Sequence, residues 1–253
     1  MSATTTTKDE SYLGVGKVWA RLYGSTAAMR HVGNVSKLSI KQKLKTIDIK
    51  DYTKPGGGTR NKIERIDSVT VDMTWLEFMT ENLVLACGGT SSNVPSATVA
   101  TEPITFVKGG LIRLAHPITS VTEVKTGTTT YTEGTDYTVS AGGLFIPDSS
   151  TIVDATEGTV TYGHPTYDQV EAGTQMSTEL EMFFEGLNEA NSDTPMLVEL
   201  WRVHMPPVDE LALLTGSDNP AEMSFSSEAL RDATKTAANA SQFYRVRKVG
   251  AAV

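Results

Sequence analysis

Two runs of alternating apolar and polar residues between Val35 and Trp75 constrain the fold of this chain more than any other feature. Successive side chains of a β-strand point to opposite faces, so each run predicts a strand with one buried face. The first run reads Lys37, Leu38, Ser39, Ile40, Lys41, Gln42, Lys43, Leu44 and Lys45, and the second reads Val69, Thr70, Val71, Asp72, Met73, Thr74 and Trp75. We therefore expect two strands, joined by a long arm, around which the rest of a β-sheet is arranged.

The segment between these strands, about residues 46–62, is much longer than the roughly two to five residues of a common hairpin loop. Its tip is Pro55 followed by three glycines, which cannot hold a helix and cost backbone entropy to fix. We therefore expect a mobile arm. Its flanks carry side chains that a purely solvated loop has little use for, and we expect binding to cover them: Ile47, Ile49, Tyr52 and Ile63.

The arm is basic, whereas the chain is acidic. Residues 37–65 contain nine Lys or Arg against Asp48, Asp51 and Glu64, while the whole chain has a formal charge of −8. This contrast favours an arm that reaches onto an acidic surface, and the alternative is an ordinary solvated loop. The arm residues that we expect to make contacts are Lys45, Lys50, Asp51, Tyr52, Lys54, Pro55, Gly56, Gly57, Gly58, Arg60 and Lys62.

After the second run, the period of the apolar residues changes to three or four. This spacing predicts one amphipathic α-helix over about residues 75–87, with Thr74 and Glu77 as a capping box and Gly88-Gly89 at its end. The apolar residues with this spacing are Leu76, Met79, Leu83 and Ala86.

The middle of the chain has a different composition. Residues 90–103 are rich in Ser, Thr, Asn, Ala and Pro, which is typical of a linker. Short apolar runs separated by glycine turns then predict a small antiparallel β subdomain, inserted at 94–165. The core would consist of residues 1–93 and 166–253. The strands expected outside the central pair are 12–23, 104–107, 111–114, 121–125, 129–132, 137–140, 144–146, 158–162, 179–185, 197–205, 223–230 and 243–249.

Size and cysteine content set further limits. At 253 residues the chain can bury a substantial core. Cys87 is its single cysteine, which excludes an internal disulfide and a cysteine-based zinc site. The first ten residues lack the apolar centre of a signal peptide, and no run approaches about 18 apolar residues. We expect a protein made in a cytoplasm, soluble on synthesis and without a membrane partner.

No motif for catalysis or cofactor binding stands out. The triple glycine is followed by Thr59-Arg60 and not by the Lys-Ser or Lys-Thr of a phosphate-binding loop. The four histidines include no pair at the spacing that places metal ligands on one helical face. We expect no enzyme activity, no catalytic residue, no cofactor and no metal. An acidic row on a later strand is either an acid–base or cation site or, more simply, a solvated strand face: Glu179, Glu181 and Glu185.

The order of these elements resembles the major tail tube protein of long-tailed, siphovirus-like bacteriophages. The resemblance covers most of the chain and is carried by residues 33–36, 45–65, 69–75, 76–89 and 223–230. In addition, residues 131–139 with 143–146 are similar to small β-units of phage structural proteins.

The resemblance implies a mainly β fold, with a two-sheet β-sandwich or barrel core, one flanking α-helix and the inserted subdomain on the outer surface. It implies a structural virion protein, present in the host cytoplasm before assembly, that forms hexameric rings stacked into the tail tube. The lumen would hold the tape-measure protein and conduct double-stranded DNA during ejection without binding it specifically. The arm would reach the adjacent ring, and Glu179, Glu181 and Glu185 would face the lumen or receive the arm. Tail terminator and distal tail proteins are the other implied partners. Edge strands and a mobile arm make premature polymerisation a hazard, so we expect an assembly chaperone or a slow nucleation step.

Three alternatives remain open at this stage. A carbohydrate-binding β-protein would act through residues 94–165. A hydrolase would need a site assembled from scattered residues. The tube subunit of a contractile tail shares the same core, so the sequence leaves the tail type undecided.

Overall fold

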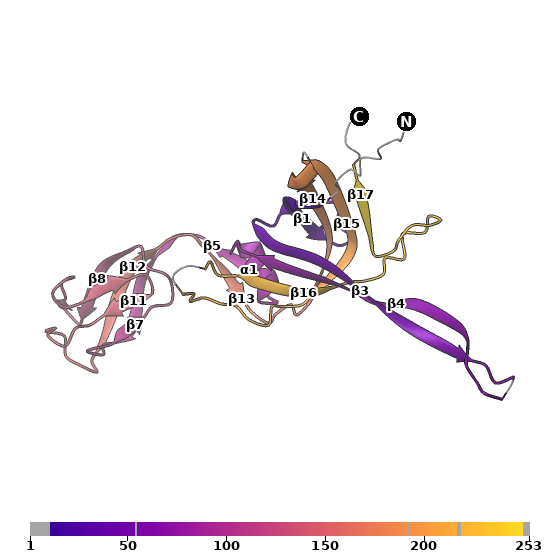
Figure 1. Cartoon of the computed structure of the whole chain (residues 1–253). Coiled ribbons are helices and arrows are strands. Elements are labelled where there is room, and N and C mark those ends of the chain that lie inside the picture. The colour runs from indigo at the N-terminus through magenta and orange to yellow at the C-terminus, as the bar shows by residue number, and fades with distance from the viewer. Residues whose placement is uncertain (1–10, 54, 192, 217–218, 250–253) are drawn as a thin grey trace. The chain divides into compact units, whose positions relative to one another are not determined.

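The computed structural model describes residues 11–53, 55–191, 193–216 and 219–249. These residues form many antiparallel β-strands and one α-helix (Figure 1), so the predicted mainly β class with a single flanking α-helix is confirmed. The chain divides into two compact units. Unit 1 comprises Met1–Ser91 and Val170–Val253, and unit 2 comprises Ser92–Gln169.

An eight-stranded antiparallel sheet forms most of unit 1. Its strands, in sheet order, are β2 (Arg30–His31), β1 (Gly14–Leu22), β14 (Thr178–Asn188), β15 (Thr194–Met205), β16 (Met223–Ala229), β4 (Thr59–Trp75) and β3 (Val35–Lys50). The eighth strand, β17 (Tyr244–Lys248), pairs with residues 196–200 of β15, whereas β16 pairs with residues 203 and 204 of the same strand. One edge of β15 therefore serves two partners in succession, and the sheet divides there into two layers around a common core. The 3₁₀ turn Glu189–Asn191 joins β14 to β15.

The core of unit 1 consists of the inward-facing residues of these two layers. On β4, every second side chain from Val69 to Trp75 is buried, as the alternating pattern predicts. Trp75 packs on Phe225 of β16, with ring centroids 4.6 Å apart. The other strands contribute the remaining buried side chains, which include Val18, Ala20, Leu180, Met182, Leu200, Val203, Met205 and Met223.

The strands β3 and β4 pair far beyond the core. Their ladder runs from Val35 opposite Trp75 to Lys50 opposite Thr59, with shifts of register along the way. The expectation of a long loop over residues 46–62 was therefore wrong, since only the turn after Lys50 is unpaired. Ile47, Ile49 and Ile63 extend the period-two pattern through the segment, and these β-branched residues favour a strand.

The helix is shorter than predicted. Helix α1 spans Thr80–Ala86, and its N-cap is Met79, without a side-chain capping bond. The predicted start at residue 75 and the capping box of Thr74 and Glu77 were wrong. Residues 74 and 75 belong to β4, because burial of Trp75 against Phe225 outweighs the local capping signal.

Unit 2 contains a four-stranded and a three-stranded sheet. The first has the order β6 (Ala97–Thr105), β12 (Glu157–His164), β8 (Ser120–Thr126), β9 (Thr129–Thr130), and the second β10 (Thr138–Ser140), β11 (Gly143–Phe145), β7 (Leu111–Arg113). Their core includes Phe106, Val124, Leu144, Ile146, Val160 and Tyr162.

The interpretation of residues 90–103 as a linker was wrong, since β6 lies there and β5 (Thr90–Val94) pairs with β13 (Tyr167–Glu171). Threonine and valine suit a strand, which outweighed the Ser and Pro signal.

Replacing Trp75 tests how much its packing contributes to the core of unit 1. We expect Trp75→Ala to lower the free energy of unfolding by about 3–5 kcal/mol, because it leaves a large cavity in the core. Trp75→Phe is the matched control. The buried indole Nε1 has no hydrogen-bond partner in the described structure. Its removal in Trp75→Phe relieves a desolvation cost, which offsets part of the free energy lost with the smaller ring. Urea denaturation followed by fluorescence of the remaining tryptophans measures both, and equal losses would contradict the prediction.

Candidate functional site

The most distinctive surface of unit 1 is the outer part of the β3–β4 hairpin, residues 44–66 (Figure 1). It contains the predicted arm of residues 46–62, and from here on we apply the name arm to all of residues 44–66. The ladder continues along it through the pairs Ile47 with Ile63 and Ile49 with Asn61. None of its described residues belongs to the core clusters. The arm is thus a paired β-structure that the core holds only at its base.

Apolar side chains lie on both faces of the arm. Alternation along β3 places Leu44 on the same face as the core-facing Leu38 and Ile40, with Ile66 as its cross-strand partner. Ile47 and Ile49 lie on the opposite face, where they are 38% and 42% exposed. The arm therefore offers apolar surface on both sides without covering either within its own chain.

The turn at the tip is built from glycine and a local hydrogen-bond network. Gly56, Gly57 and Gly58 have φ values of 106°, 61° and 135°, a region that side-chain-bearing residues rarely adopt. The N–H of Asp51 donates to the carbonyl of Gly58 at 2.8 Å. The hydroxyl of Thr53 donates to the Asp51 carboxylate at 2.6 Å, and this bond, together with the N–H of Thr53, holds the pKa of Asp51 below its ordinary value.

Tyr52, beside this network, is 90% exposed. The tip thus presents an aromatic ring on a turn with defined internal bonds. Among the predicted contact residues, Pro55 and the glycines lie in this turn, and Lys45, Lys50, Arg60 and Lys62 lie on the paired strands. Lys54 is outside the described residues.

The positive charge of the hairpin is partly neutralised near the core and remains along the arm. Lys41 and Lys43 form ion pairs with Asp72 and Asp67 at 2.6 and 2.9 Å, and Lys62 lies 4.0 Å from Asp48. In the described part of the chain, the remaining arm cations have no carboxylate within ion-pair distance. They are Lys45, Lys50, Arg60 and Arg65.

The predicted acidic row lies on the outer face of β14, opposite the core residues Leu180 and Met182. Arg202 donates to both oxygens of Glu179, at 2.8 and 2.7 Å. Arg21 forms an ion pair with Glu181 at 2.7 Å.

Glu185, the third member of the row, accepts a hydrogen bond from the Trp19 indole at 3.3 Å and lies across from Lys17 of β1. The three carboxylates do share one face, as alternation implies. Neighbouring strands supply cations, however, so this face is not the concentrated negative surface that the sequence of β14 alone implies.

Two aromatic clusters were not recognised in the sequence. Trp201 is covered by cations from the C-terminal part of the chain, with Lys235 Nζ 4.3 Å and Arg245 Cζ 5.2 Å from its ring centroid. In unit 2, the rings of His116 and His164 stack 4.3 Å apart. No spacing rule links residues so distant in sequence, which is why sequence reasoning missed both clusters.

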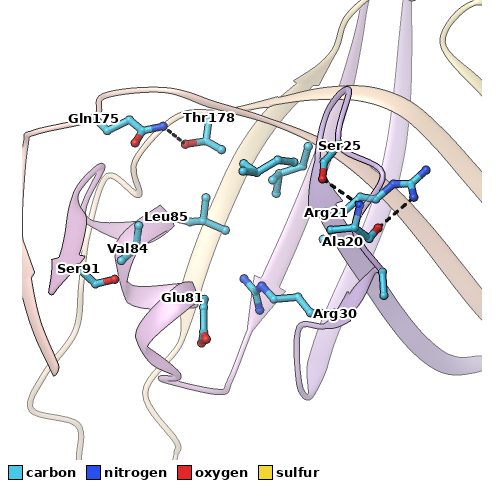
Figure 2. Close-up of a pocket in the computed structure, with 14 residues that line it drawn as sticks. Ala20, Arg21, Ser25, Arg30, Glu81, Val84, Leu85, Ser91, Gln175 and Thr178 are labelled. Atoms are coloured by element: carbon cyan, nitrogen blue, oxygen red, sulfur yellow. Dashed lines mark hydrogen bonds between the residues drawn. The ribbon is translucent and has the colours of Figure 1, made fainter. Parts of the chain in front are cut away.

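A pocket of about 400 Å³ lies between α1, the start of β14 and the segment after β1 (Figure 2). Its walls are mainly apolar side chains, and Arg30 points into it from β2. Asn82 of α1 accepts a hydrogen bond from Arg30 at 2.9 Å and donates to the carbonyls of Val32 and Glu77. Burial lowers the pKa of Arg30, against the opposing effect of Glu81. No pattern in the sequence indicated this pocket.

Among the residues that the structure describes, no three His, Cys, Asp or Glu side chains are arranged to hold a metal ion. Within the same residues, no helix is long and apolar enough to cross a bilayer.

Comparison with known proteins gives one family match. A family model described as "Protein of unknown function UCP028589" matches residues 11–247, which is nearly the whole chain. A search of curated proteins found no match.

Removing the arm tests whether it supports the fold. In a shortened variant, Thr46 is joined to Glu64 through Asn-Gly, a sequence that favours a two-residue hairpin turn at this opposed pair. We expect the free energy of unfolding to change by less than about 0.5 kcal/mol, because no described residue among those removed belongs to a core cluster or is a hydrophobic packed against one. Urea denaturation measures this, and a loss of several kcal/mol would show that the arm is part of the folded core.

The ion pair of Glu179 predicts a pH dependence. The hydrogen bonds from Arg202 lower the pKa of Glu179, so the pair stabilises the fold above the unfolded pKa of about 4.3 and loses this effect as pH falls through the lower folded pKa. We expect Arg202→Met to be less stable than the parent at about pH 7, with the difference shrinking below about pH 4. Urea denaturation across this range tests it, with Arg202→Met compared in a Glu179→Gln background as control, where the pH dependence of the difference should disappear. A pH-independent difference would contradict the assignment.

Proposed function

We propose that this chain, which belongs to the family of proteins of unknown function UCP028589, is a structural subunit that assembles with its own copies into stacked hexameric rings forming the tail tube of a long-tailed bacteriophage. The single observation that carries the proposal is the arm, a paired hairpin that continues beyond the core with apolar side chains on both faces. The resemblance described above supplies the ring and tube.

A two-stranded hairpin in water is marginal on its own, so an exposed arm favours a partner that covers it. Ile47, Ile49 and Ile63 are already partly covered by each other, and burying the rest of their surface would contribute roughly 1 kcal/mol each. Tyr52 adds an exposed aromatic ring at the tip. An arm docking on a different surface of the next copy makes a heterologous contact, which repeats without limit in a stack.

The sheet of unit 1 is also open. Its order ends at β3, so one edge of this long strand is unpaired within the sheet. Lys37, Lys41, Lys43 and Lys45 lie along the strand, and lysines on an edge discourage indiscriminate pairing. This combination suits a subunit that must pair with its own copies but not with arbitrary strands.

We assign the outer face of β14 to the lumen. Its ion pairs balance the charges of Glu179 and Glu181. This face therefore lacks the excess of Lys and Arg side chains that binds DNA phosphates with release of counterions. A balanced wall would let double-stranded DNA pass without strong adhesion. The tape-measure protein, tail terminator and distal tail proteins remain the proposed partners, and the virion tail the proposed location.

Unit 2 is proposed as an outer domain. Carbohydrate-binding proteins commonly present aromatic rings to sugars, whereas Phe106, Tyr137 and Tyr162 of this unit are buried. Phe145 is 40% exposed, but one exposed ring does not by itself form a sugar-binding surface.

Assembly tests the proposal directly. We expect purified protein at high concentration to form six-fold rings or hollow tubes in negative-stain electron microscopy. The variant Ile47→Thr, Ile49→Thr, Ile63→Thr keeps β-branched residues on the arm but removes apolar surface, and we expect it to need at least about tenfold more protein to assemble.

The matched control is Asp48→Asn with Lys62→Gln, which alters the opposite face of the same arm without changing its net charge. It should assemble nearly as the parent does. Normal tubes from the triple variant would remove the arm from the assembly mechanism.

A further inference from the structure

We propose that the pocket beside α1 receives the segment 206–216 of a neighbouring copy, which carries Leu213 and Leu214. The proposal rests on the proposed self-assembly and adds to it a second contact, distinct from the arm. Both surfaces belong to unit 1.

The segment 206–216 is an unusual piece of surface. It has no regular secondary structure. The side chains of Val208 and Leu211 pack against the core cluster, and Val208 donates its N–H to the carbonyl of Ala86 at 3.0 Å. Leu213 and Leu214 then follow with 74% and 97% exposure. The segment is anchored at one end and presents two adjacent, uncovered leucines at the other.

The pocket has the complementary character. Its apolar lining residues are Ala20, Leu22, Ala27, Ala28, Val84, Leu85 and Leu180, and its volume of about 400 Å³ is within the range of sites that hold small ligands or side chains. Contact between apolar walls and water is unfavourable, and inserted leucine side chains would remove both apolar surfaces from water.

Charge selects this occupant over the arm. Arg30 is held in the pocket by Asn82. Glu81 also lines the pocket and acts electrostatically on Arg30, but in the described structure no carboxylate lies within ion-pair distance of this guanidinium. The segment carries Asp209 and Glu210, both exposed, and no Lys or Arg. An incoming carboxylate would pair with the partly desolvated guanidinium, whereas the basic arm would be repelled.

In the proposed assembly each copy inserts its segment into the pocket of the next copy and receives the segment of the previous one, so the contact is heterologous. Repeated in this way it generates rings or filaments, whereas a reciprocal exchange between two copies would close as a dimer. It thereby serves the lateral or axial joining of subunits that the proposed function requires.

Disulfide trapping tests the contact between chains. Two variants are prepared in a Cys87→Ala background, one with Leu214→Cys and the other with Ala28→Cys, and they carry different affinity tags. After mixing and mild oxidation, we expect a disulfide-linked heterodimer to form at least about tenfold faster than when Leu214→Cys is mixed with Thr130→Cys, an exposed position in unit 2. A rate equal to this control would overturn the proposal.

A single variant that carries both cysteines distinguishes a contact between two copies from a contact within one chain. Cross-linked oligomers are expected. Exclusive formation of an internal disulfide would show that the segment closes over its own pocket, and would also overturn the proposal.

Assembly provides the second readout. Leu213→Asp with Leu214→Asp should raise the protein concentration needed for ring formation at least about tenfold, whereas Thr215→Asp, which adds a charge at the next exposed position, should not. Ala28→Trp fills the pocket and should have the same effect as the leucine variant. A mixture of the leucine and pocket variants should give heterodimers and no rings, since only one of the two junctions is intact.

The two proposals can fail separately. Rings from the parent protein with trapping at the control rate would leave the structural role intact and remove this contact. Efficient trapping without rings or tubes would keep the contact and overturn the tail-tube assignment.

Discussion

The structure depends on one continuous ladder of backbone hydrogen bonds between β3 and β4. At its inner end, the ladder places Val71, Met73 and Trp75 in the core. At its outer end, the same ladder carries Ile47 and Ile49 into solvent. Packing of the inner part against β16 holds the outer part in a paired conformation that an isolated hairpin would not keep. Fold and proposed assembly surface are therefore two ends of one element.

Local pattern predicted much of this fold. Alternation identified the inner parts of β3 and β4 and most short strands of unit 2, because one face of each is buried and the other is solvated. The errors arose where tertiary contacts decide the outcome. Trp75 continues a strand because Phe225, 150 positions later, covers it. Residues 97–105 form a strand because β12 pairs with them, although their composition resembles a linker.

The candidate surfaces were predictable to different degrees. The arm could be found because its charge, glycines and apolar flanks are contiguous in sequence. The acidic row of β14 was also visible, but its partners Arg21 and Arg202 lie on other strands, so the sequence overstated its negative charge. The pocket beside α1 joins residues near 20–30, 81–85 and 175–180, and a signal divided among three segments cannot be seen before the chain is folded.

An open sheet with exposed apolar segments is unfavourable for a protein that must remain a monomer. The edge of β3, both faces of the arm and the two leucines after Leu211 all expose groups that another chain could cover. Each lies beside a charge that restricts the partner: lysines along the edge, cations along the arm, and carboxylates beside the leucines. Apolar surface supplies the free energy of such contacts, whereas charge determines which surface is accepted. The basic arm and the acidic leucine segment therefore select different docking surfaces, and a subunit with two such contacts can be joined in two directions at once, which is the requirement for building a tube and not merely a ring.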